Sequence, residues 1–358
     1  MIRADKDLAF MLRYENIAWY DDCKVKILDR RIYPIKTEFV TCYNHKEVAK
    51  AIADMVTQSG GPYTAAAMGM VLATYEAKNK NKKDMIAYLE DAAYTLSHAR
   101  PTTVSNMVKT VNVCLDSAKT AIECGEDVVT AVFNTAVDEV NKKYERFEKV
   151  GEYLASKFPQ NGTVMTQCFG ETIIGMMLRA CRKNNKNVKF ICPETRPYFQ
   201  GARLTASCIC DMGFDVTVIT DNMPAFVMKE KNVDVFTSAA DVITMDGYVV
   251  NKIGTFQIAL AANYWGIPYY VTGTPDISHP TIDSVKIEQR DPLLVMESLG
   301  TKTTMEGVKG YYPAFDITPP KLCNGVVTDK GIYPPFDLYA YYKDWDKTKG
   351  DINSAYCP

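Results

Sequence analysis

Apolar and polar residues alternate in short bursts between residues 13 and 42, the pattern of half-buried strands. The stretch AWYDDCKVKIL contains Asp21 and Asp22 as a turn between two such bursts. These features predict a small β element near the N-terminus. From residue 44 the apolar spacing changes to three or four residues, the period of an amphipathic helix, and Asn44 is placed to cap its start.

Helical spacing then continues through most of the N-terminal half. Ser59-Gly60-Gly61-Pro62 interrupts it, and Pro62 suits the start of the next helix because proline lacks an N–H that would be unpaired there. Further helices are predicted at 62–79 and 84–99, and two long apolar stripes predict helices over 104–122 and 129–147. The turn-rich segment KFPQNG at 157–162 predicts a boundary between domains 1–158 and 159–358.

After residue 162, short runs rich in Val and Ile alternate with helical stretches. Strands are predicted at 162–168, 188–192, 215–220, 233–238, 241–247 and 268–273, and helices at 171–183, 202–213, 224–231, 255–266 and 319–327. Such runs are typical of strands buried on both faces of a parallel sheet. The predicted fold class is therefore α/β: a mainly helical N-terminal domain with a small β element, followed by a Rossmann-like doubly wound parallel-sheet domain.

Several polar residues follow the predicted strands directly. Ligands of doubly wound sheets bind at the carboxyl ends of the strands. We therefore expect one crevice to collect the residues at these ends, which are Cys168, Glu194, Thr195, Arg196, Asp221, Asp241 and Thr274.

The net charge and the cysteines indicate which kinds of binding partner and which cellular compartment to expect. The 358 residues carry a formal net charge of −2, with no basic footprint for nucleic acid and no polybasic patch for a membrane surface. No run approaches the roughly 20 apolar residues of a membrane span. Eleven scattered cysteines, an odd number, favour free thiols in a reducing compartment. We expect a soluble cytoplasmic protein that binds neither nucleic acid nor membrane.

The absent motifs exclude several kinds of chemistry. The sequence has no Walker-type loop, no strand-linked GxGxxG, no nucleophile elbow and no CxxC pair. Its three histidines, His45, His98 and His279, are far apart. A histidine-rich metal centre or a Cys-His catalytic pair is therefore not expected.

Cys168 and Asp241 are the candidate reactive groups, and each has a plainer alternative. Cys168 precedes a predicted helix, whose positive end would stabilise a thiolate; most cysteines, however, are simply small buried apolar residues. Asp241 stands where the chain enters the core, and burial raises the pKa of an acid enough to make it a proton donor. A turn or helix cap is an equally good interpretation of Asp241.

Two strand-to-helix connections are candidate anion sites. In PETRPYFQGARLT, Arg196 and Arg203 bring positive charge to the start of a predicted helix. In NKIGT, Asn251 and Lys252 precede a Gly-Thr helix start. Turn and cap chemistry would explain both segments equally well.

These segments together resemble the methylthioribose-1-phosphate isomerase family, which is related to ribose-1,5-bisphosphate isomerases and to the regulatory subunits of a eukaryotic translation-initiation exchange factor. The resemblance covers nearly the whole chain. It rests on IAWYDDCKVKILDRRIYP, SGGPYTAAAMG, ARPTTVSN, the strand before Cys168, PETRPYFQGARLTA, ITDNMPAFVMKEKNVD, the Asp241 segment, NKIGT, IPYYV, EQRDP and PAFDITP.

The resemblance implies a homodimeric aldose–ketose isomerase that acts on a small sugar phosphate without metal or cofactor. It implies that Cys168 and Asp241 are the catalytic pair. The implied substrate-binding residues are Ser59, Gly60, Gly61, Arg100, Gln200, Asn251 and Lys252.

Three positions depart from the family pattern. Ser59 stands where the family has an arginine, which removes a bidentate phosphate partner. Phe169-Gly170-Glu171 replaces an asparagine and small residues after Cys168, and Val242 replaces an arginine. The substrate implied is 5-methylthioribose 1-phosphate or a close 5-substituted ribose 1-phosphate, such as 5-deoxyribose 1-phosphate. A ribose-1,5-bisphosphate isomerase and a non-catalytic subunit that senses sugar phosphates are the alternatives.

Overall fold

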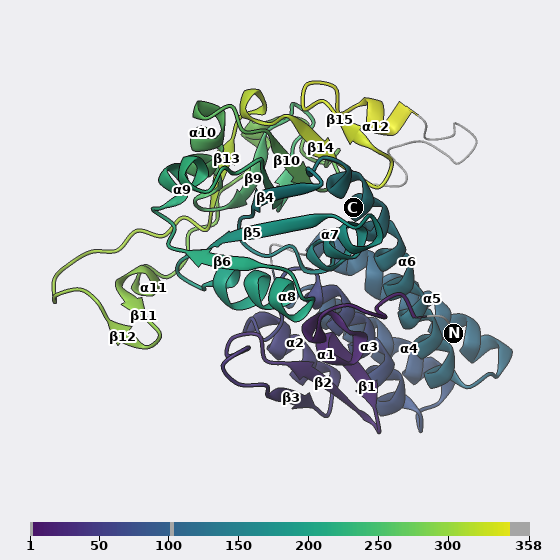
Figure 1. Cartoon of the computed structure of the whole chain (residues 1–358). Helices are drawn as coiled ribbons and strands as arrows, with labels where there is room; N and C mark the ends of the chain where they lie inside the picture. Colours follow the sequence, from purple (N-terminus) through teal and green to yellow (C-terminus); the bar gives the residue numbers. More distant parts are fainter. Residues whose placement is uncertain (1–2, 101–103, 344–358) are drawn as a thin grey trace. The chain divides into compact units, whose positions relative to one another are not determined.

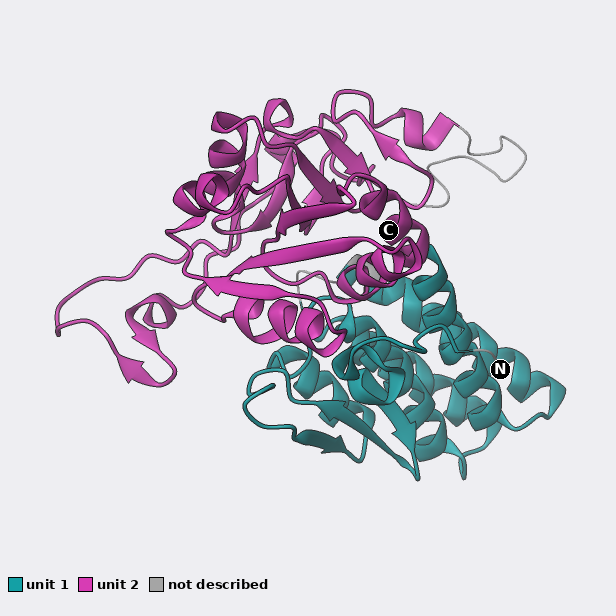
Figure 2. Ribbon diagram, viewed as in Figure 1, with its two compact units in different colours: residues 1–146 teal, residues 147–358 magenta. Residues whose placement is uncertain are grey.

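The computed structural model describes residues 3–100 and 104–343. The chain divides into two compact units, residues 1–146 and 147–358 (Figure 2). The division falls within helix α6 (Val128–Ser156), and the predicted boundary segment 157–162 lies between this helix and the next strand. The domain limits at residues 158 and 159 stay a prediction.

The first unit contains the expected small β element. Strands β1 (Ala18–Asp21), β2 (Lys24–Leu28) and β3 (Phe39–Cys42) form an antiparallel sheet in the order β1-β2-β3. The β1–β2 turn holds Asp22 and Cys23 at positive φ, which agrees with the turn predicted here. A 3₁₀ turn, η1 (Phe10–Leu12), and the short helix α1 (Tyr14–Ile17) precede the sheet.

The helices of the first unit surround α3. They are α2 (His45–Ala53), α3 (Gly61–Ala77), α4 (Lys82–Ser97), α5 (Val104–Cys124) and the first part of α6. Because α2, α4 and α5 all contact α3 and it also lies on β1 and β2, α3 is buried on nearly every side. Its almost uninterrupted apolar sequence follows from that central position. Pro62 is in its first turn, as predicted.

Asn44 caps helix α2 as the sequence predicted. Its side-chain oxygen accepts a hydrogen bond from the Glu47 N–H at 2.9 Å, and the Glu47 carboxylate accepts one from the Tyr43 N–H at 2.7 Å. We expect Asn44→Ala to lower the free energy of unfolding by about 1 kcal/mol, because it leaves an N–H of the first turn without its partner. Urea denaturation followed by circular dichroism measures this change. Asn112→Ala, within α5, is the control, and an equal loss there would contradict the capping role.

The second unit is built on a seven-stranded sheet in the order β15-β14-β10-β7-β4-β5-β6. Its strands are β4 (Asn161–Met165), β5 (Asn187–Pro193), β6 (Val216–Ile219), β7 (Val235–Ala239), β10 (Tyr269–Thr272), β14 (Gly325–Val327) and β15 (Ile332–Tyr333). All neighbours pair in parallel except β15. This confirms the predicted doubly wound fold.

Helices cover the two faces of this sheet (Figure 1). They are α7 (Glu171–Lys183) and α8 (Ala206–Asp211) on one face, and α9 (Pro224–Glu230) and α10 (Thr255–Tyr264) on the other. The predicted helix at 202–213 begins as a π-helical turn, η3 (Gly201–Thr205). A wide turn of this kind often marks a functional site.

The sequence analysis missed a second, smaller sheet. Strands β8 (Val242–Ile243), β9 (Val249–Lys252) and β13 (Phe315–Thr318) pair antiparallel, with β9 in the middle. The strand predicted at 241–247 is therefore mostly wrong: only β8 is extended, and Gly247 turns the chain back toward β9 at φ +88°.

The helix predicted at 319–327 is also wrong. A 3₁₀ turn, η5 (Pro320–Leu322), is followed by β14, whose Val326 and Val327 pair with β10. This short apolar run has helical spacing, but pairing with β10 in the large sheet makes it a strand.

An excursion leaves the second unit between β10 and β13 (Figure 1). It contains η4 (Ile282–Ser284), α11 (Leu293–Met296), β11 (Glu297–Ser298) and β12 (Thr301–Lys302). Its two roots meet at a bridge between Gln289 and Pro313. The last described element of the chain is α12 (Ala340–Lys343).

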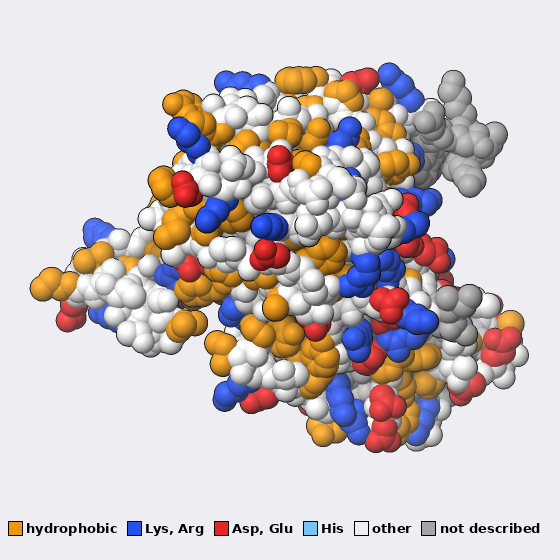
Figure 3. Space-filling model, viewed as in Figure 1, with side chains coloured by type: hydrophobic (Ala, Val, Ile, Leu, Met, Phe, Trp, Pro, Cys, Tyr) orange, Lys and Arg blue, Asp and Glu red, His pale blue; other side chains and the backbone are white. Residues whose placement is uncertain are grey.

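Three further observations concern the surface charges, the cysteines and the hydropathy of the helices. Basic and acidic side chains are interspersed over the face shown in Figure 3. Within the described ranges, every cysteine is a free thiol and no helix is long and apolar enough to span a lipid bilayer.

Candidate active site

The strand order of the large sheet defines where a ligand is expected. From β4 the chain runs outward through β5 and β6, and then returns to β7 on the other side of β4. The crevice between β4 and β7 is thus the topological switch point, the usual ligand position in such sheets. Cys168 follows β4 and Asp241 follows β7. Gln200 follows β5, the other neighbour of β4.

Cys168 lies in a sharp turn between β4 and α7. Its backbone is in the left-handed region at φ +59°, and the Thr205 hydroxyl donates a hydrogen bond to its carbonyl oxygen. Gly170 continues the turn, and a methyl group there would meet the Ala239 side chain at 3.0 Å. The turn therefore packs Gly170 against the end of β7, with the half-buried Cys168 two residues before it.

The electrostatic surroundings of Cys168 contradict a stabilised thiolate. Burial raises the pKa of its thiol to about 11; Lys252 opposes this shift, and Asp241 adds to it. The expectation that the start of α7 lowers the pKa is therefore wrong, because desolvation of the charged form outweighs nearby positive charge. Cys168 is a neutral thiol at pH 7.

Asp241 is close enough to influence both Cys168 and Lys252. Its N–H donates a hydrogen bond to the Val250 carbonyl at 2.9 Å, which fixes its backbone at the edge of the small sheet. Its side chain is exposed, so the prediction that it enters the core was wrong.

Asn251 and Lys252 are fixed by the central strand β9. The Asn251 amide donates to the Thr255 hydroxyl at 3.0 Å, and that hydroxyl donates to the Lys252 carbonyl at 2.7 Å. Lys252 is only 5% exposed, and its ammonium lies 4.6 Å from the centre of the Phe315 ring. It makes no hydrogen bond or ion pair with any residue that the structure describes.

Burial lowers the pKa of Lys252, and Arg290 lowers it further, while Cys168 and Asp241 raise it. A buried cation without a counter-charge is costly and points to a bound anion. Lys252 is therefore the best candidate in this unit for holding a phosphate group.

Arg290 is a site residue whose role the sequence analysis did not assign. Its guanidinium pairs with Glu288 at 2.7 Å and lies 5.5 Å from the Phe315 ring and 5.7 Å from the Tyr198 ring. The EQRDP segment was noted only as part of the family pattern. Nothing local reveals that the bridge at the roots of the excursion brings Arg290 to Lys252.

The PETRP connection does not form the predicted anion site. The N–H groups of Thr195 and Arg196 donate to the Asp221 carboxylate at 2.8 and 2.6 Å, so Asp221 caps this turn. The Arg196 guanidinium donates to the Glu297 carbonyl at 2.7 Å, and that of Arg203 donates to the Tyr198 carbonyl at 2.6 Å. Both cations thus bind backbone carbonyls.

Gln200 follows this connection, and its side chain is only 6% exposed. At Gly201, a methyl group would lie 1.8 Å from the Pro193 carbonyl oxygen, so only glycine allows the turn to close here. Thr274 lies beyond β10 and Glu194 beside Asp221.

The remaining predicted residues belong to the first unit. In the loop before α3, Ser59 has φ +57° and the Lys143 ammonium donates to the Gly60 carbonyl at 3.0 Å. A methyl group at Gly61 would lie 1.9 Å from the Thr57 hydroxyl. The buried Arg30 guanidinium donates to the Gln58 carbonyl at 2.9 Å and so supports the same loop. Arg100 is half-buried just after α4.

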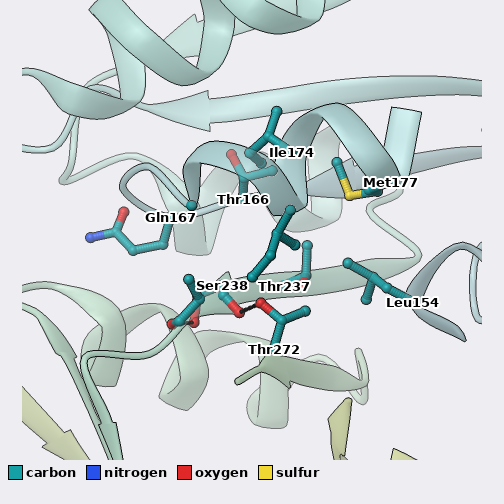
Figure 4. A pocket seen from close by; sticks show the side chains of 11 residues that line it. Leu154, Thr166, Gln167, Ile174, Met177, Thr237, Ser238 and Thr272 are labelled. Atoms are coloured by element: carbon teal, nitrogen blue, oxygen red, sulfur yellow. Dashed lines mark hydrogen bonds between the residues drawn. The ribbon is translucent and has the colours of Figure 1, made fainter. Parts of the chain in front are cut away.

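A small cavity lies behind the Cys168 turn (Figure 4). Its volume of about 10 Å³ suits one water molecule at most. Its walls come from α6, β7, β10, α7 and the end of β4, and include Leu154, Thr166, Ile174, Met177, Thr237, Ser238 and Thr272. It is too small to be the substrate pocket.

Cys168, Asp241 and the buried Lys252 thus lie near the switch point of a doubly wound sheet, the position where α/β proteins of this class usually bind ligands. Comparison with known proteins agrees. The profile described as "Initiation factor 2 subunit family" matches residues 57–335. Methylthioribose-1-phosphate isomerase of Thermosipho africanus (strain TCF52B) is 34% identical over 341 residues, covering 91% of this chain and 97% of the relative. The isomerase of Desulforamulus reducens is also 34% identical, covering 90% and 96%.

Solved structures give the same result. The 5-methylthioribose 1-phosphate isomerase from Pyrococcus horikoshii OT3 has a TM-score of 0.82 and 29% identity, covering 94% of this chain and 98% of that one. The translation initiation factor eIF-2B, subunit delta, from A. fulgidus has a TM-score of 0.77 and 31% identity, covering 91% and 97%. The chain belongs to the methylthioribose-1-phosphate isomerase family within the initiation factor 2 subunit family, and it is an enzyme of the isomerase class.

Proposed function

We propose that this enzyme converts 5-methylthioribose 1-phosphate to the corresponding ribulose 1-phosphate. The observation that carries the proposal is Lys252, a buried cation that makes no hydrogen bond or ion pair with the described residues and lies close to Cys168 and Asp241. A sugar phosphate supplies the missing negative charge and brings its carbon skeleton to the thiol. The names of the relatives support the same substrate.

The reaction begins with ring opening. A sugar phosphorylated on its anomeric oxygen has no free aldehyde, so an acid must first protonate the ring oxygen as its bond to carbon 1 breaks. We assign this proton to Asp241, which follows β7 at the switch point of the sheet. Because Asp241 is exposed, the substrate itself must cover it before it works as an acid.

Hydrogen then moves from carbon 2 to carbon 1, and the hydroxyl on carbon 2 becomes the ketone by giving its proton to the Asp241 carboxylate that ring opening left. With a pKa of about 11, the Cys168 thiolate makes up only about 10⁻⁴ of the molecules at pH 7. A proton route through this thiolate is therefore disfavoured. We propose a direct hydride shift, with the neutral Cys168 thiol shaping a dry surface beside carbons 1 and 2.

Lys252→Met tests the anion site. Because the substrate loses a charged hydrogen-bond partner worth about 1.5–3 kcal/mol, we expect KM to rise about 10- to 100-fold. Phosphorus NMR time courses with 5-methylthioribose 1-phosphate measure it. Thermal stability should not fall, since the variant removes an unpaired buried charge.

Lys189→Met, at an exposed position on β5, is the matched control for this variant. An unchanged KM in Lys252→Met would remove Lys252 from the phosphate site. Absence of turnover by the folded wild type would overturn the substrate assignment.

One observation keeps a second function in view. The similarity to the solved eIF-2B delta subunit shows that this fold is also described as a translation factor. A non-catalytic sensing role predicts tight binding of a sugar phosphate without turnover. Faster turnover of 5-deoxyribose 1-phosphate or ribose 1,5-bisphosphate than of 5-methylthioribose 1-phosphate would keep the isomerase assignment. It would change only the substituent at carbon 5 of the substrate.

A further inference from the structure

Gln167 links the two segments that carry the candidate site. It directly precedes Cys168, and its side chain is only 3% exposed. Its amide Nε2 donates a hydrogen bond to the Ile253 carbonyl at 3.3 Å, and a methyl group at Gly254 would lie 3.2 Å from the same nitrogen. The Gln167 side chain thus reaches from the Cys168 turn to the turn that follows Lys252.

The other end of this amide has no partner. Oε1 of Gln167 is buried and accepts no hydrogen bond from any residue in the described ranges. The bond to Ile253 fixes which end of the amide is which, because only the NH₂ group can donate to a carbonyl. A buried acceptor without a donor costs about 1–3 kcal/mol, and native proteins rarely leave one without a reason.

Gln200 shows the same feature. Its Oε1 is also buried and without a donor among the described residues. The two glutamines follow the adjacent parallel strands β4 and β5. Gln167 also lines the small cavity, and in Figure 4 its amide points away from Ser238 and Thr272.

The chemistry of the missing partner follows from these acceptors. A phosphate dianion has no proton to donate, so it satisfies Lys252 but neither glutamine oxygen. Sugar hydroxyls do donate, and the ring form of a 5-substituted ribose 1-phosphate has two of them, on carbons 2 and 3. We propose that Gln167 is a further substrate-binding residue, whose Oε1 accepts a hydrogen bond from one of these hydroxyls. This inference rests on the proposed function.

The test is a cycle of binding measurements. Dissociation constants for 5-methylthioribose 1-phosphate and its 2-deoxy and 3-deoxy analogues are measured by calorimetry on the Cys168→Ser protein, with and without Gln167→Met. We expect Gln167→Met to weaken binding of the full sugar about tenfold, the effect of one hydrogen bond. The same change should have almost no effect on the analogue that lacks the recognised hydroxyl.

Gln160→Met is the matched control. Gln160 precedes the opposite end of β4, is exposed, and also donates its amide to a backbone carbonyl, that of Asn185 at 2.6 Å. It should leave all three constants unchanged. Thermal denaturation checks the fold, and Gln167→Leu replaces Gln167→Met if the latter does not fold.

The outcomes separate this inference from the proposed function. An equal loss with the full sugar and both analogues means that Gln167 acts only on the fold, and it overturns the inference while wild-type turnover keeps the function. A hydroxyl-dependent loss without wild-type turnover keeps Gln167 as a sugar contact and overturns the isomerase assignment. Failure of all three sugars to bind overturns both.

Discussion

Cys168→Ala is expected to lower kcat/KM by about 10²-fold, the loss that follows when reacting atoms are misplaced by about 1 Å. Cys168 follows β4 at the switch point of the sheet, where carbons 1 and 2 of the sugar are expected. Alanine leaves space that water enters, and water competes with hydrogen transfer. Phosphorus NMR of product formation measures the loss.

Two further measurements define the role of Cys168. Its alkylation by iodoacetamide should be slow at pH 7.5 and should rise toward pH 11, because burial raises the pKa of its thiol to about 11 and only the thiolate reacts. In D₂O the product should carry no deuterium at carbon 1, as a hydride shift requires. Cys210→Ala, at an exposed position, is the control and should keep full activity. Fast alkylation at pH 7.5 together with deuterium uptake would establish the proton route instead.

Asp241→Asn is expected to lower kcat by about 10²- to 10⁴-fold, with a much smaller change in KM. The amide keeps the size and the hydrogen-bonding capacity of the side chain but donates no proton to the ring oxygen, so the cyclic substrate stays closed. Steady-state kinetics with 5-methylthioribose 1-phosphate separate the two constants.

Asp283→Asn, at an exposed position in η4, is the control for Asp241. Retention of kcat in Asp241→Asn would assign ring opening to a different acid. A rise in KM alone would make Asp241 a binding group, which its exposed position also allows.

The sequence predicted those parts of the fold that depend on local periodicity. The strands that end before Cys168 and Asp241 were recognised from their runs of Val and Ile, and α7 was predicted with its observed ends. The alternation of these elements was sufficient to infer a doubly wound sheet. The small sheet was missed because β9 and β13 meet only through pairing across about 60 residues, with Lys252 opposite Phe315.

The candidate site, too, could be predicted from the sequence only where it depends on local patterns. Cys168 and Asp241 stand at strand ends that a sequence pattern identifies, but their burial is a tertiary property. Packing leaves Asp241 exposed and desolvates Cys168, the reverse of what each local segment indicates. The approach of Arg290 to Lys252 and the unpartnered oxygen of Gln167 likewise depend on segments that meet only in the folded chain.

Because of Lys252, we expect the lifetime of the enzyme in a cell to depend on how much of its ligand is present. Among the described residues the buried Lys252 ammonium has no hydrogen bond or ion pair, and an anion that binds only the folded state lowers the cost of burying it. A ligand at a hundred times its dissociation constant stabilises the fold by about 2.7 kcal/mol, which lowers the unfolded fraction about 100-fold. Since proteases act on unfolded chains, a cell that lacks the substrate would clear this enzyme faster than one that supplies it.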